Sequence, residues 1–348
     1  MKKVRIGIIG LGFMGTTHFG IHQINPQAEV VAVADIDPVK LTGDISAVSG
    51  NIGTRDSNQL DFTGITAYSD PYKLINDPNV DMVDICVPTF VHCKYAMAAL
   101  LAGKHVFLEK PMARSIAEVE EIAEAARNSD KYFNIGMCVR AWPEYYDART
   151  RFQTGEFGKL KSANFRRLSQ SVDGGSWENW FMNDERAGGA LLDLHMHDID
   201  QVRFFFGRPQ AVTSFGVRGV RSDRAVDHVV TNYDFGDGTL VIAEGGWAAA
   251  KTVPFEMSFQ LICEKATVRF MSEGYKIYWE DGRVETPEVA DAKLPTGWHK
   301  ELFYFVSCIL DGVKPEKYQT LGEIVDSFKI YEAEARSVDS KETVKINY

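Results

Sequence analysis

The chain has 348 residues, of which 45% are hydrophobic and 25% are charged, and its formal net charge at pH 7 is −10. This length predicts about two domains of a soluble globular protein. The acidic charge argues against a nucleic acid or an anionic membrane as a partner, and no apolar run is long enough to span a bilayer. The five cysteines form no C-x-x-C pair. Because no signal-peptide pattern is found either, we expect a cytoplasmic protein with reduced thiols.

The first expected strand, residues 4–9, leads directly into a G-x-G-x-x-G motif. Such a motif turns the chain tightly and presents the N-terminus of the next helix to a pyrophosphate. A glycine turn without a ligand is the alternative explanation of the motif, so the residues around it decide. The expected cofactor contacts here are Gly10, Gly12, Phe13, Met14 and Gly15.

The second expected strand, residues 29–35, ends in Asp35, which lies 20 residues after Gly15. A carboxylate at this position accepts hydrogen bonds from the adenosine ribose hydroxyls and repels a 2′-phosphate. Ile36 follows, where an NADP enzyme would more often carry a basic or small polar residue. Asp35 could instead be a helix N-cap or a turn residue. We expect the cofactor to be NAD rather than NADP.

Strands then alternate with helices as far as residue 135, which predicts a doubly wound parallel sheet of the Rossmann type. The expected strands are 66–68, 82–87, 105–108 and 132–135, and the expected helices are 71–75, 93–102 and 116–128. Residues 50–64 form a polar, glycine-punctuated segment that we interpret as a surface insertion without an assigned function.

The strand over 82–87 ends in polar residues, at the sheet edge where open α/β sheets bind ligands. Pro88 and Thr89 would end this strand beside the cofactor, and His92 lies just inside the next helix. A plain strand–turn–helix connection with Thr89 as the N-cap gives the same pattern. We include Pro88, Thr89 and His92 among the candidate cofactor contacts.

The strand over 105–108 ends in Glu109-Lys110-Pro111, an ionisable pair held between a buried strand and a proline. A cis bond before Pro111 would aim Lys110 into the cleft. Together with the glycine motif and Pro88-Thr89-x-x-His92, the run 102–111 resembles the Gfo/Idh/MocA oxidoreductases. That family includes glucose–fructose oxidoreductase and inositol dehydrogenase, and the resemblance covers nearly the whole chain. It implies that Lys110 contacts the reacting substrate oxygen and that Glu109 lies near the nicotinamide ribose.

A second domain is expected over residues 137–348, after a dinucleotide-binding domain over 1–136. Its longer strands and hairpin signals predict an α+β domain with a large, mostly antiparallel open sheet. The expected strands are 162–168, 211–219, 228–235, 239–247, 255–263, 266–271 and 276–279. The resemblance implies that one sheet face pairs subunits, so we expect a homodimer or homotetramer. Arg140 lies at the crossover between the domains and is a candidate substrate contact.

Residues 188–206 contain the second cluster of ionisable groups and are interpreted as one helix. Asp193 and His197 are four residues apart and would share a face, so that the carboxylate orients the imidazole for use as a general base. The cluster resembles the family's Gly-Gly-x-Leu-x-Asp-x-Gly-x-His signature, which implies that Asp193 and His197 line the substrate site. His195 stands where many members carry glycine, and on a helix it would point away from His197. We keep His195 as a candidate substrate residue.

A metal site in this cluster is possible from the inventory of histidines and aspartates, but rings two residues apart on a helix diverge, so we expect none. Trp180, in a polar loop before the helix, suits a sugar or polyol ring and equally suits loop packing. We therefore expect an NAD-dependent oxidoreductase that acts on a secondary alcohol or ketone of a sugar, cyclitol or polyol. The alternatives are an NAD-dependent glycosidase with transient oxidation and a non-catalytic dinucleotide-binding regulator. The sequence does not identify the sugar or polyol, or the physiological direction of the reaction.

Overall fold

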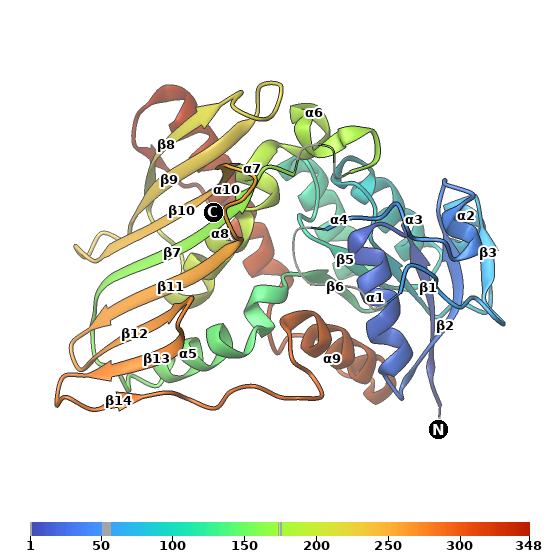
Figure 1. The fold of residues 1–348 in the computed structure, drawn as a ribbon, viewed down its shortest axis with the longest axis horizontal. Coiled ribbons are helices and arrows are strands. Elements are labelled where there is room, and N and C mark those ends of the chain that lie inside the picture. Colours follow the sequence, from blue (N-terminus) through green and yellow to red (C-terminus); the bar gives the residue numbers. More distant parts are fainter. Residues whose placement is uncertain (1, 51–56, 173, 175) are drawn as a thin grey trace. The chain divides into compact units, whose positions relative to one another are not determined.

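The structure, a computed structural model, describes residues 2–50, 57–172, 174 and 176–348. Contacts divide the chain into two compact units (Figure 1). The first unit comprises residues 1–138, 175–178 and 298–321, and the second comprises 139–174, 179–297 and 322–348. The predicted insertion at 50–64 includes residues 51–56, which lie outside the described residues. None of the described helices is long and apolar enough to cross a membrane.

The first unit contains a six-stranded parallel sheet with the strand order β3-β2-β1-β4-β5-β6. This order reverses direction at β1, so the predicted doubly wound Rossmann sheet is confirmed. Its strands are β1 (Val4–Ile9), β2 (Ala28–Ala34), β3 (Thr66–Tyr68), β4 (Met82–Ile85), β5 (His105–Glu109) and β6 (Phe133–Gly136). Its helices are α1 (Phe13–Ile24), α2 (Pro71–Ile75), α3 (His92–Leu101), α4 (Ile116–Asn128) and α9 (Gly297–Asp311), with short 3₁₀ turns η1 (Lys40–Thr42) and η2 (Thr89–Val91).

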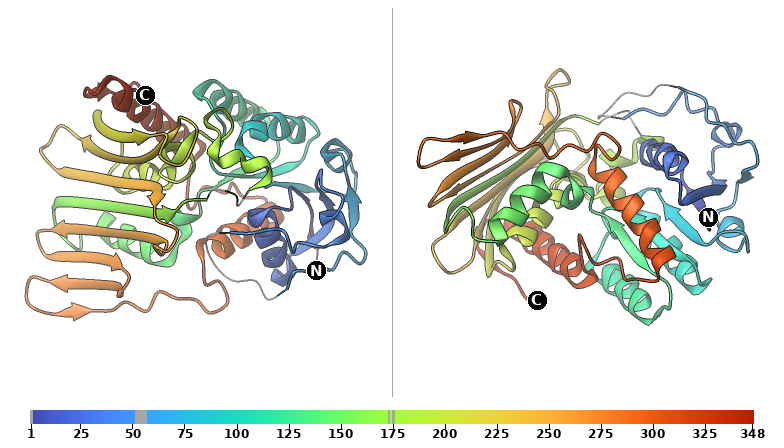
Figure 2. Two further views of the ribbon diagram at one scale, coloured as in Figure 1. Left: turned by 45° about the horizontal axis from the view of Figure 1, so that its top comes forward. Right: turned by 90° about the horizontal axis from the view of Figure 1, so that it is seen from below.

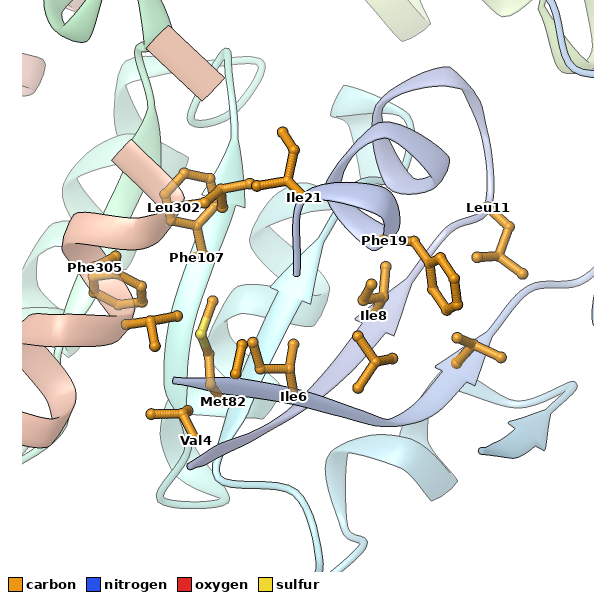
Figure 3. Close-up of a cluster of buried hydrophobic side chains, with 14 residues drawn as sticks. Val4, Ile6, Ile8, Leu11, Phe19, Ile21, Met82, Phe107, Leu302 and Phe305 are labelled. Atoms are coloured by element: carbon orange, nitrogen blue, oxygen red, sulfur yellow. The ribbon is translucent and has the colours of Figure 1, made fainter. Parts of the chain in front are cut away.

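One apolar core of the first unit lies between the sheet and helices α1 and α9 (Figure 3). Val4, Ile6 and Ile8 alternate along β1 and share one face because side chains of a strand have a period of two. Phe107 on β5 packs against Phe305 on α9, with ring centroids 5.7 Å apart. The other buried members of this core are Leu11, Phe19, Ile21, Ala28, Val30, Val33, Met82, Leu302 and Val306.

Helix α9 is the main difference between the observed units and the predicted domains. The sequence prediction placed residues 137–348 in one domain, whereas residues 298–321 pack with the first unit. The physical reason is the apolar stripe of Leu302, Phe305 and Val306, whose spacing of three and four residues puts them on one helix face. That face is buried against Phe107 and β1, so the chain returns to the first sheet late in the sequence.

The second unit contains a nine-stranded sheet with the order β14-β13-β12-β11-β7-β10-β9-β8-β15. Strands β7 and β10 pair in parallel, and the other pairs within the described ranges are antiparallel. The large, mostly antiparallel open sheet is thus confirmed. Its strands are β7 (Leu160–Gln170), β8 (Ala211–Arg218), β9 (Val226–Asp234), β10 (Leu240–Ala249), β11 (Glu256–Cys263), β12 (Ala266–Met271), β13 (Gly274–Trp279), β14 (Val284–Glu285) and β15 (Val344–Lys345).

Helices cover one face of this sheet and leave the other open (Figure 2). The helices of this unit are α5 (Pro143–Gln153), α6 (Asp184–Ala187), α7 (Gly189–Asp193), α8 (Met196–Phe206) and α10 (Leu321–Ser340), with 3₁₀ turns η3 (Cys138–Ala141) and η4 (Trp177–Met182). On the open face, Phe215 of β8 lies opposite Val230 of β9, and their side chains are 66% and 39% exposed. Leu240 and Ile262 are also exposed, and both lie opposite Ser162 of β7. The second unit therefore presents an apolar surface on its open sheet face.

Candidate active site

The glycine turn between β1 and α1 has the geometry expected of a phosphate-binding turn. Gly10 has a φ of 92°, a left-handed conformation that favours glycine, and a Cβ on it would collide with the Cys86 carbonyl oxygen. A Cβ on Gly15 would overlap the carbonyl oxygen of Gly10, so the first turn of α1 packs directly on the strand. At Gly12, a Cβ would meet no described atom within 4 Å. Gly12 is also the N-cap of α1 and makes no side-chain cap bond.

Asp35 lies at the end of β2, and backbone N–H groups hold its carboxylate beside the glycine turn. The N–H of Leu11 donates to Oδ2 over 2.7 Å, and the N–H of Asp37 donates to Oδ1 over 2.8 Å. Lys40 adds a cation, with its Nζ 3.6 Å from Asp35 Oδ2. Lys40 was not among the residues predicted from the sequence, although it lies only five residues after Asp35. The open space at Gly12 and the anchored carboxylate fit the pyrophosphate and the adenosine ribose of a dinucleotide.

His92 connects two loops at the carboxyl edge of the sheet. Its side chain is buried, with Nδ1 2.7 Å from the Pro111 carbonyl oxygen and Nε2 2.8 Å from that of Val87. Burial lowers the pKa of His92, although the two carbonyl oxygens favour the protonated ring. Both ring nitrogens are therefore occupied by protein atoms, and His92 acts on this edge by holding the loops. Thr89 is buried in η2 and Pro88 is the N-cap of that turn, so Thr89 does not cap α3.

Glu109 and Lys110 lie at the end of β5, and the Lys110–Pro111 bond is cis, as predicted. The Glu109 carboxylate is buried, and its Oε2 accepts a hydrogen bond from the Lys110 backbone N–H over 3.1 Å. Gly136 on β6 leaves room for this carboxylate, because a Cβ there would lie 2.8 Å from Glu109 Oε1. The pair thus follows a strand of the sheet whose carboxyl edge also carries the glycine turn and Asp35.

The prediction of one continuous helix over residues 188–206 was wrong. Helix α7 ends at Asp193 and α8 begins at Met196. Between them the N–H groups of Leu194 and His195 both donate to the Ala190 carbonyl oxygen, over 3.0 and 2.8 Å, which makes one wide turn. An extra residue in a turn changes the phase of every later side chain. The contact between Asp193 and His197 that the four-residue spacing suggested therefore stays a prediction.

His195, a candidate substrate residue, lies inside the second unit between the sheet and α10. Its side chain is fully buried, with Nε2 3.3 Å from Glu334 Oε2 on α10 and 3.5 Å from the Tyr233 hydroxyl on β9. Gly245 on β10 makes room for the ring, because a Cβ at that position would clash with it. With its polar atom facing Glu334 and Tyr233, His195 has a structural role.

Arg140, a candidate substrate contact, is fully buried, and its guanidinium forms an ion pair with Asp200 on α8. Nε donates to Oδ2 over 2.7 Å and Nη2 donates to Oδ1 over 2.8 Å, while Nη1 contacts Glu323 at 3.2 Å. The guanidinium carbon also lies 4.5 Å from the centroid of the Phe204 ring. Contact with a substrate would require this network to break, which costs several kcal/mol.

The remaining predicted residues lie in the second unit. His197 is buried in the first turn of α8, and Asp193 is partly exposed at the end of α7. Trp180 lies in η4 and stacks on Phe181, with ring centroids 4.0 Å apart. The preceding residues Glu178 and Asn179 have positive φ angles of 48° and 51°, a conformation that is unusual for residues other than glycine and recurs at functional sites. Lys110 belongs to the first unit, so its approach to these groups is part of the proposal below.

Sequence analysis missed a group of buried ionisable residues under the glycine turn. His18 and His22 on α1 both contact Asp84 on β4, and Cys86 lies beside them. Among the described residues, His18, Asp84 and Cys86 form the group whose possible metal-ligand atoms lie within 4.8 Å of one another. Two signals were available in the sequence: histidines four residues apart on one helix, and an aspartate inside an apolar strand.

Comparison with known proteins gives matches over most of the chain. The GFO_IDH_MocA family model, described as "Oxidoreductase family, NAD-binding Rossmann fold", matches residues 4–137. The model of the GFO/IDH/MocA C-terminal domain matches residues 145–269. The chain is 30% identical to levoglucosan dehydrogenase of Pseudarthrobacter phenanthrenivorans over 62% of its own length and 54% of that protein. It is 29% identical to the NAD⁺-dependent scyllo-inositol 2-dehydrogenase of Bacillus subtilis over 73% of its own length and 69% of that protein.

The solved structures give the same fold. Levoglucosan dehydrogenase in complex with NADH and levoglucosan superposes with a TM-score of 0.84 at 21% identity, over 100% of both chains. A probable dehydrogenase from Thermotoga maritima superposes with a TM-score of 0.78 at 23% identity, over 98% of both chains. At these identities the similarity concerns the fold. The alignment with the first of the curated relatives spans about half of that protein's length.

Proposed function

Because this chain belongs to the Gfo/Idh/MocA family of NAD-binding oxidoreductases, we propose that it transfers hydride between NAD and a secondary alcohol or ketone of a sugar, cyclitol or polyol. The observation that carries this proposal is the arrangement at the carboxyl edge of the first sheet. An open glycine turn, an anchored Asp35 and the Glu109-Lys110 pair lie at the ends of β1, β2 and β5. Ligands of doubly wound sheets bind at this edge.

The cofactor is held by the residues of the glycine turn and by Asp35 in this proposal. The N-terminus of α1 attracts the pyrophosphate, and Asp35 accepts hydrogen bonds from the ribose hydroxyls. Bound NAD supplies the hydride acceptor in the oxidising direction. Glu109 lies near the nicotinamide ribose, and Pro88 and Thr89 border the same edge.

The proton and the developing charge are handled by three side chains. In the oxidising direction His197 accepts the proton of the substrate hydroxyl, and Asp193 orients the His197 ring. Lys110 donates a charge-assisted hydrogen bond to the oxygen as negative charge develops on it. In the reducing direction the same groups return the proton to the carbonyl oxygen. Trp180 contributes an aromatic face for the substrate ring.

The relatives' names support the substrate class. One is a dehydrogenase of levoglucosan, which is an anhydro sugar, and another is a dehydrogenase of scyllo-inositol, which is a cyclitol. The test is a screen for NADH formation from NAD over cyclitols, aldoses, anhydro sugars and linear polyols. We expect stoichiometric NADH with at least one of them. Glycoside cleavage without net NADH would favour the glycosidase alternative, and NAD binding without either reaction would favour a regulator.

The open face of the nine-stranded sheet supports a proposal for assembly. Phe215, Val230, Leu240 and Ile262 are exposed on this face, and exposed apolar side chains on a sheet face without covering helices support an interface. We infer that two copies pair through it, as a homodimer or within a homotetramer. The free thiols of all five cysteines support a cytoplasmic location.

A further inference from the structure

The buried polar group under the glycine turn is built around Asp84. His18 Nδ1 lies 3.1 and 3.0 Å from the two carboxylate oxygens of Asp84, and His22 Nε2 lies 3.0 Å from Oδ2. The side chains of His18, His22 and Asp84 are all fully buried. An ionised carboxylate at such a depth requires hydrogen-bond donors, and the two imidazoles supply them.

Through its second ring nitrogen, His18 also contacts Glu109 at the carboxyl edge of the first sheet. His18 Nε2 lies 3.2 Å from Glu109 Oε1, a distance typical of an ion pair, although the N–H does not point directly at the oxygen. The other oxygen of Glu109 accepts the Lys110 backbone N–H over 3.1 Å. The His18 ring therefore lies between two carboxylates, one inside the unit and one adjoining Lys110.

The charges around His18 favour an imidazolium in this position. Burial opposes a charge on His18, yet Asp84 raises the pKa of the ring well above its usual value. Burial likewise raises the pKa of the Asp84 carboxyl, but His18 and His22 hold it below its usual range. Burial raises the pKa of the Cys86 thiol, and burial together with Glu109 raises that of Glu301 on α9. Burial thus favours the neutral forms of Cys86 and Glu301, while Asp84 favours the charged form of His18.

A bound cation is the alternative occupant of this group, because His18, Asp84 and Cys86 have suitable atoms. The distances between the imidazole nitrogens and the Asp84 oxygens fit hydrogen bonds better than ligands of a shared metal ion. Nitrogen and oxygen ligands of a tetrahedral zinc, each about 2.0–2.1 Å from the ion, lie roughly 3.3 Å apart. The contacts from His18 and His22 to Asp84 are 3.0 to 3.1 Å, which is the length of a hydrogen bond.

We propose that His18 is a positioning residue that fixes the Glu109 carboxylate for cofactor binding. Asp84 orients the His18 ring through Nδ1, and the ring holds Glu109 through Nε2. Without this contact the Glu109 carboxylate keeps only the Lys110 N–H as a hydrogen-bond donor among the described residues, and we expect it to move away from its position. The inference rests on the proposed function, because Glu109 acts on NAD only if the chain binds NAD at this edge.

The chain offers a matched pair of substitutions for the test. In His18→Asn, the amide nitrogen takes the place of Nδ1 and keeps the bond to Asp84, while the contact with Glu109 is lost. In His22→Gln, the amide nitrogen takes the place of Nε2 and likewise keeps the bond to Asp84. Both variants shorten a buried imidazole on the same face of α1, and only the first one affects Glu109.

The measurement is the dissociation constant of NADH, by fluorescence titration, in a double-mutant cycle with Glu109→Gln. We expect His18→Asn to weaken NADH binding about 10-fold, and His22→Gln to change it less than about 2-fold. In the Glu109→Gln background, His18→Asn should raise the dissociation constant of NADH by less than about 2-fold, because the effects of residues that act through one another are not additive. His18→Gln, which keeps a donor near Glu109, should recover part of the affinity and serves as the second variant if His18→Asn fails to fold.

Two results would overturn the role of His18. The first is that His18→Asn changes the dissociation constant of NADH by the same factor in the wild-type and the Glu109→Gln backgrounds. The second is that His18→Asn and His22→Gln change this constant equally. A stoichiometric zinc ion, whose removal by chelation abolishes NADH binding, would also overturn it, by replacing the imidazolium with a metal. A wild-type protein that binds neither NADH nor NAD would contradict the proposed function itself, which is a distinguishable outcome.

Discussion

Arg140 and Asp200 form a two-pronged ion pair inside the second unit, with contacts of 2.7 and 2.8 Å. The Arg140 side chain is fully buried, and Ser327 Oγ adds a hydrogen bond of 2.8 Å to Asp200 Oδ1. Arg140 joins the start of the second unit to α8, the helix that carries His197. This residue therefore contributes to the position of the proposed base through α8.

Loss of this pair should be a severe change in stability. Arg140→Met leaves Asp200 as a buried unpaired charge, and breaking a buried pair in this way costs about 3–5 kcal/mol. Urea denaturation followed by circular dichroism measures the free energy of unfolding. The double variant Arg140→Met/Asp200→Asn should lose less of the free energy of unfolding than Arg140→Met alone. The control is Arg283→Met, which breaks an exposed pair with Asp281 and should change the free energy of unfolding far less. Similar losses at both sites would contradict the structural role of Arg140.

Asp35 should make the protein prefer NAD over NADP. Its carboxylate is fixed by the Leu11 N–H, so a 2′-phosphate would face a negative charge that cannot rotate away. We expect NAD to bind at least about 10-fold more tightly than NADP, and Asp35→Ser to reduce that ratio. Asp37→Ser is the matched control, because the Asp37 carboxylate caps the Val39 N–H instead. Equal binding of the two cofactors by the wild type would show that Lys40, which lies 3.6 Å from Asp35, offsets the repulsion.

Glu301 should make the protein less stable as the pH rises. Burial and the nearby Glu109 raise the pKa of Glu301 well above its ordinary value of 4.5. The native state therefore keeps a proton that the unfolded chain releases above about pH 4.5, so stability falls as the pH increases through this range. Glu301→Gln removes the effect. The free energy of unfolding of Glu301→Gln should exceed that of the wild type, and the difference should be larger at pH 8 than at pH 5. Glu280→Gln, at an exposed position, should show no such difference between the two pH values.

Assembly should depend on the open sheet face. Phe215→Asp places a charge opposite the exposed Val230 on this face, and light scattering should show a shift from dimer or tetramer to monomer. The control is Leu101→Asp, which changes a residue of α3 that is 83% exposed and lies in the other unit. A wild-type protein that is monomeric at micromolar concentration would contradict this interface.

The fold was predictable because its signals are local. Apolar runs ending in glycine or proline mark the parallel strands, and glycine-rich turns such as Gly236-Asp237-Gly238, between β9 and β10, mark the antiparallel hairpins. The placement of α9 was not predictable, because its partner Phe107 is about 200 residues earlier in the chain. Its apolar stripe shows that one face is buried, but the stripe does not identify the surface that covers it.

The site was predictable where a backbone geometry requires a residue type. Gly10, Gly12, Gly15 and the segment before Pro111 have the conformations that the motifs imply. The burial of Arg140 and His195 was not predictable, because it depends on tertiary partners, here Asp200 and Glu334, that no local pattern reveals. The break between α7 and α8 was missed for a similar reason, since a wide turn at Leu194 and His195 leaves the hydrophobic pattern on both sides intact.

The most direct test of NAD-dependent dehydrogenation at this site is the initial rate of NADH formation, measured with the best substrate of the screen beside the dissociation constant of NADH. His197→Ala and Lys110→Met should each lower kcat by roughly 10²- to 10⁴-fold with little change in NADH binding, because these groups act on the substrate oxygen. His195→Gln, which keeps a donor for Glu334, should retain most of the activity. An active His197→Ala beside an inactive, folded His195→Gln would contradict the assignment of the base.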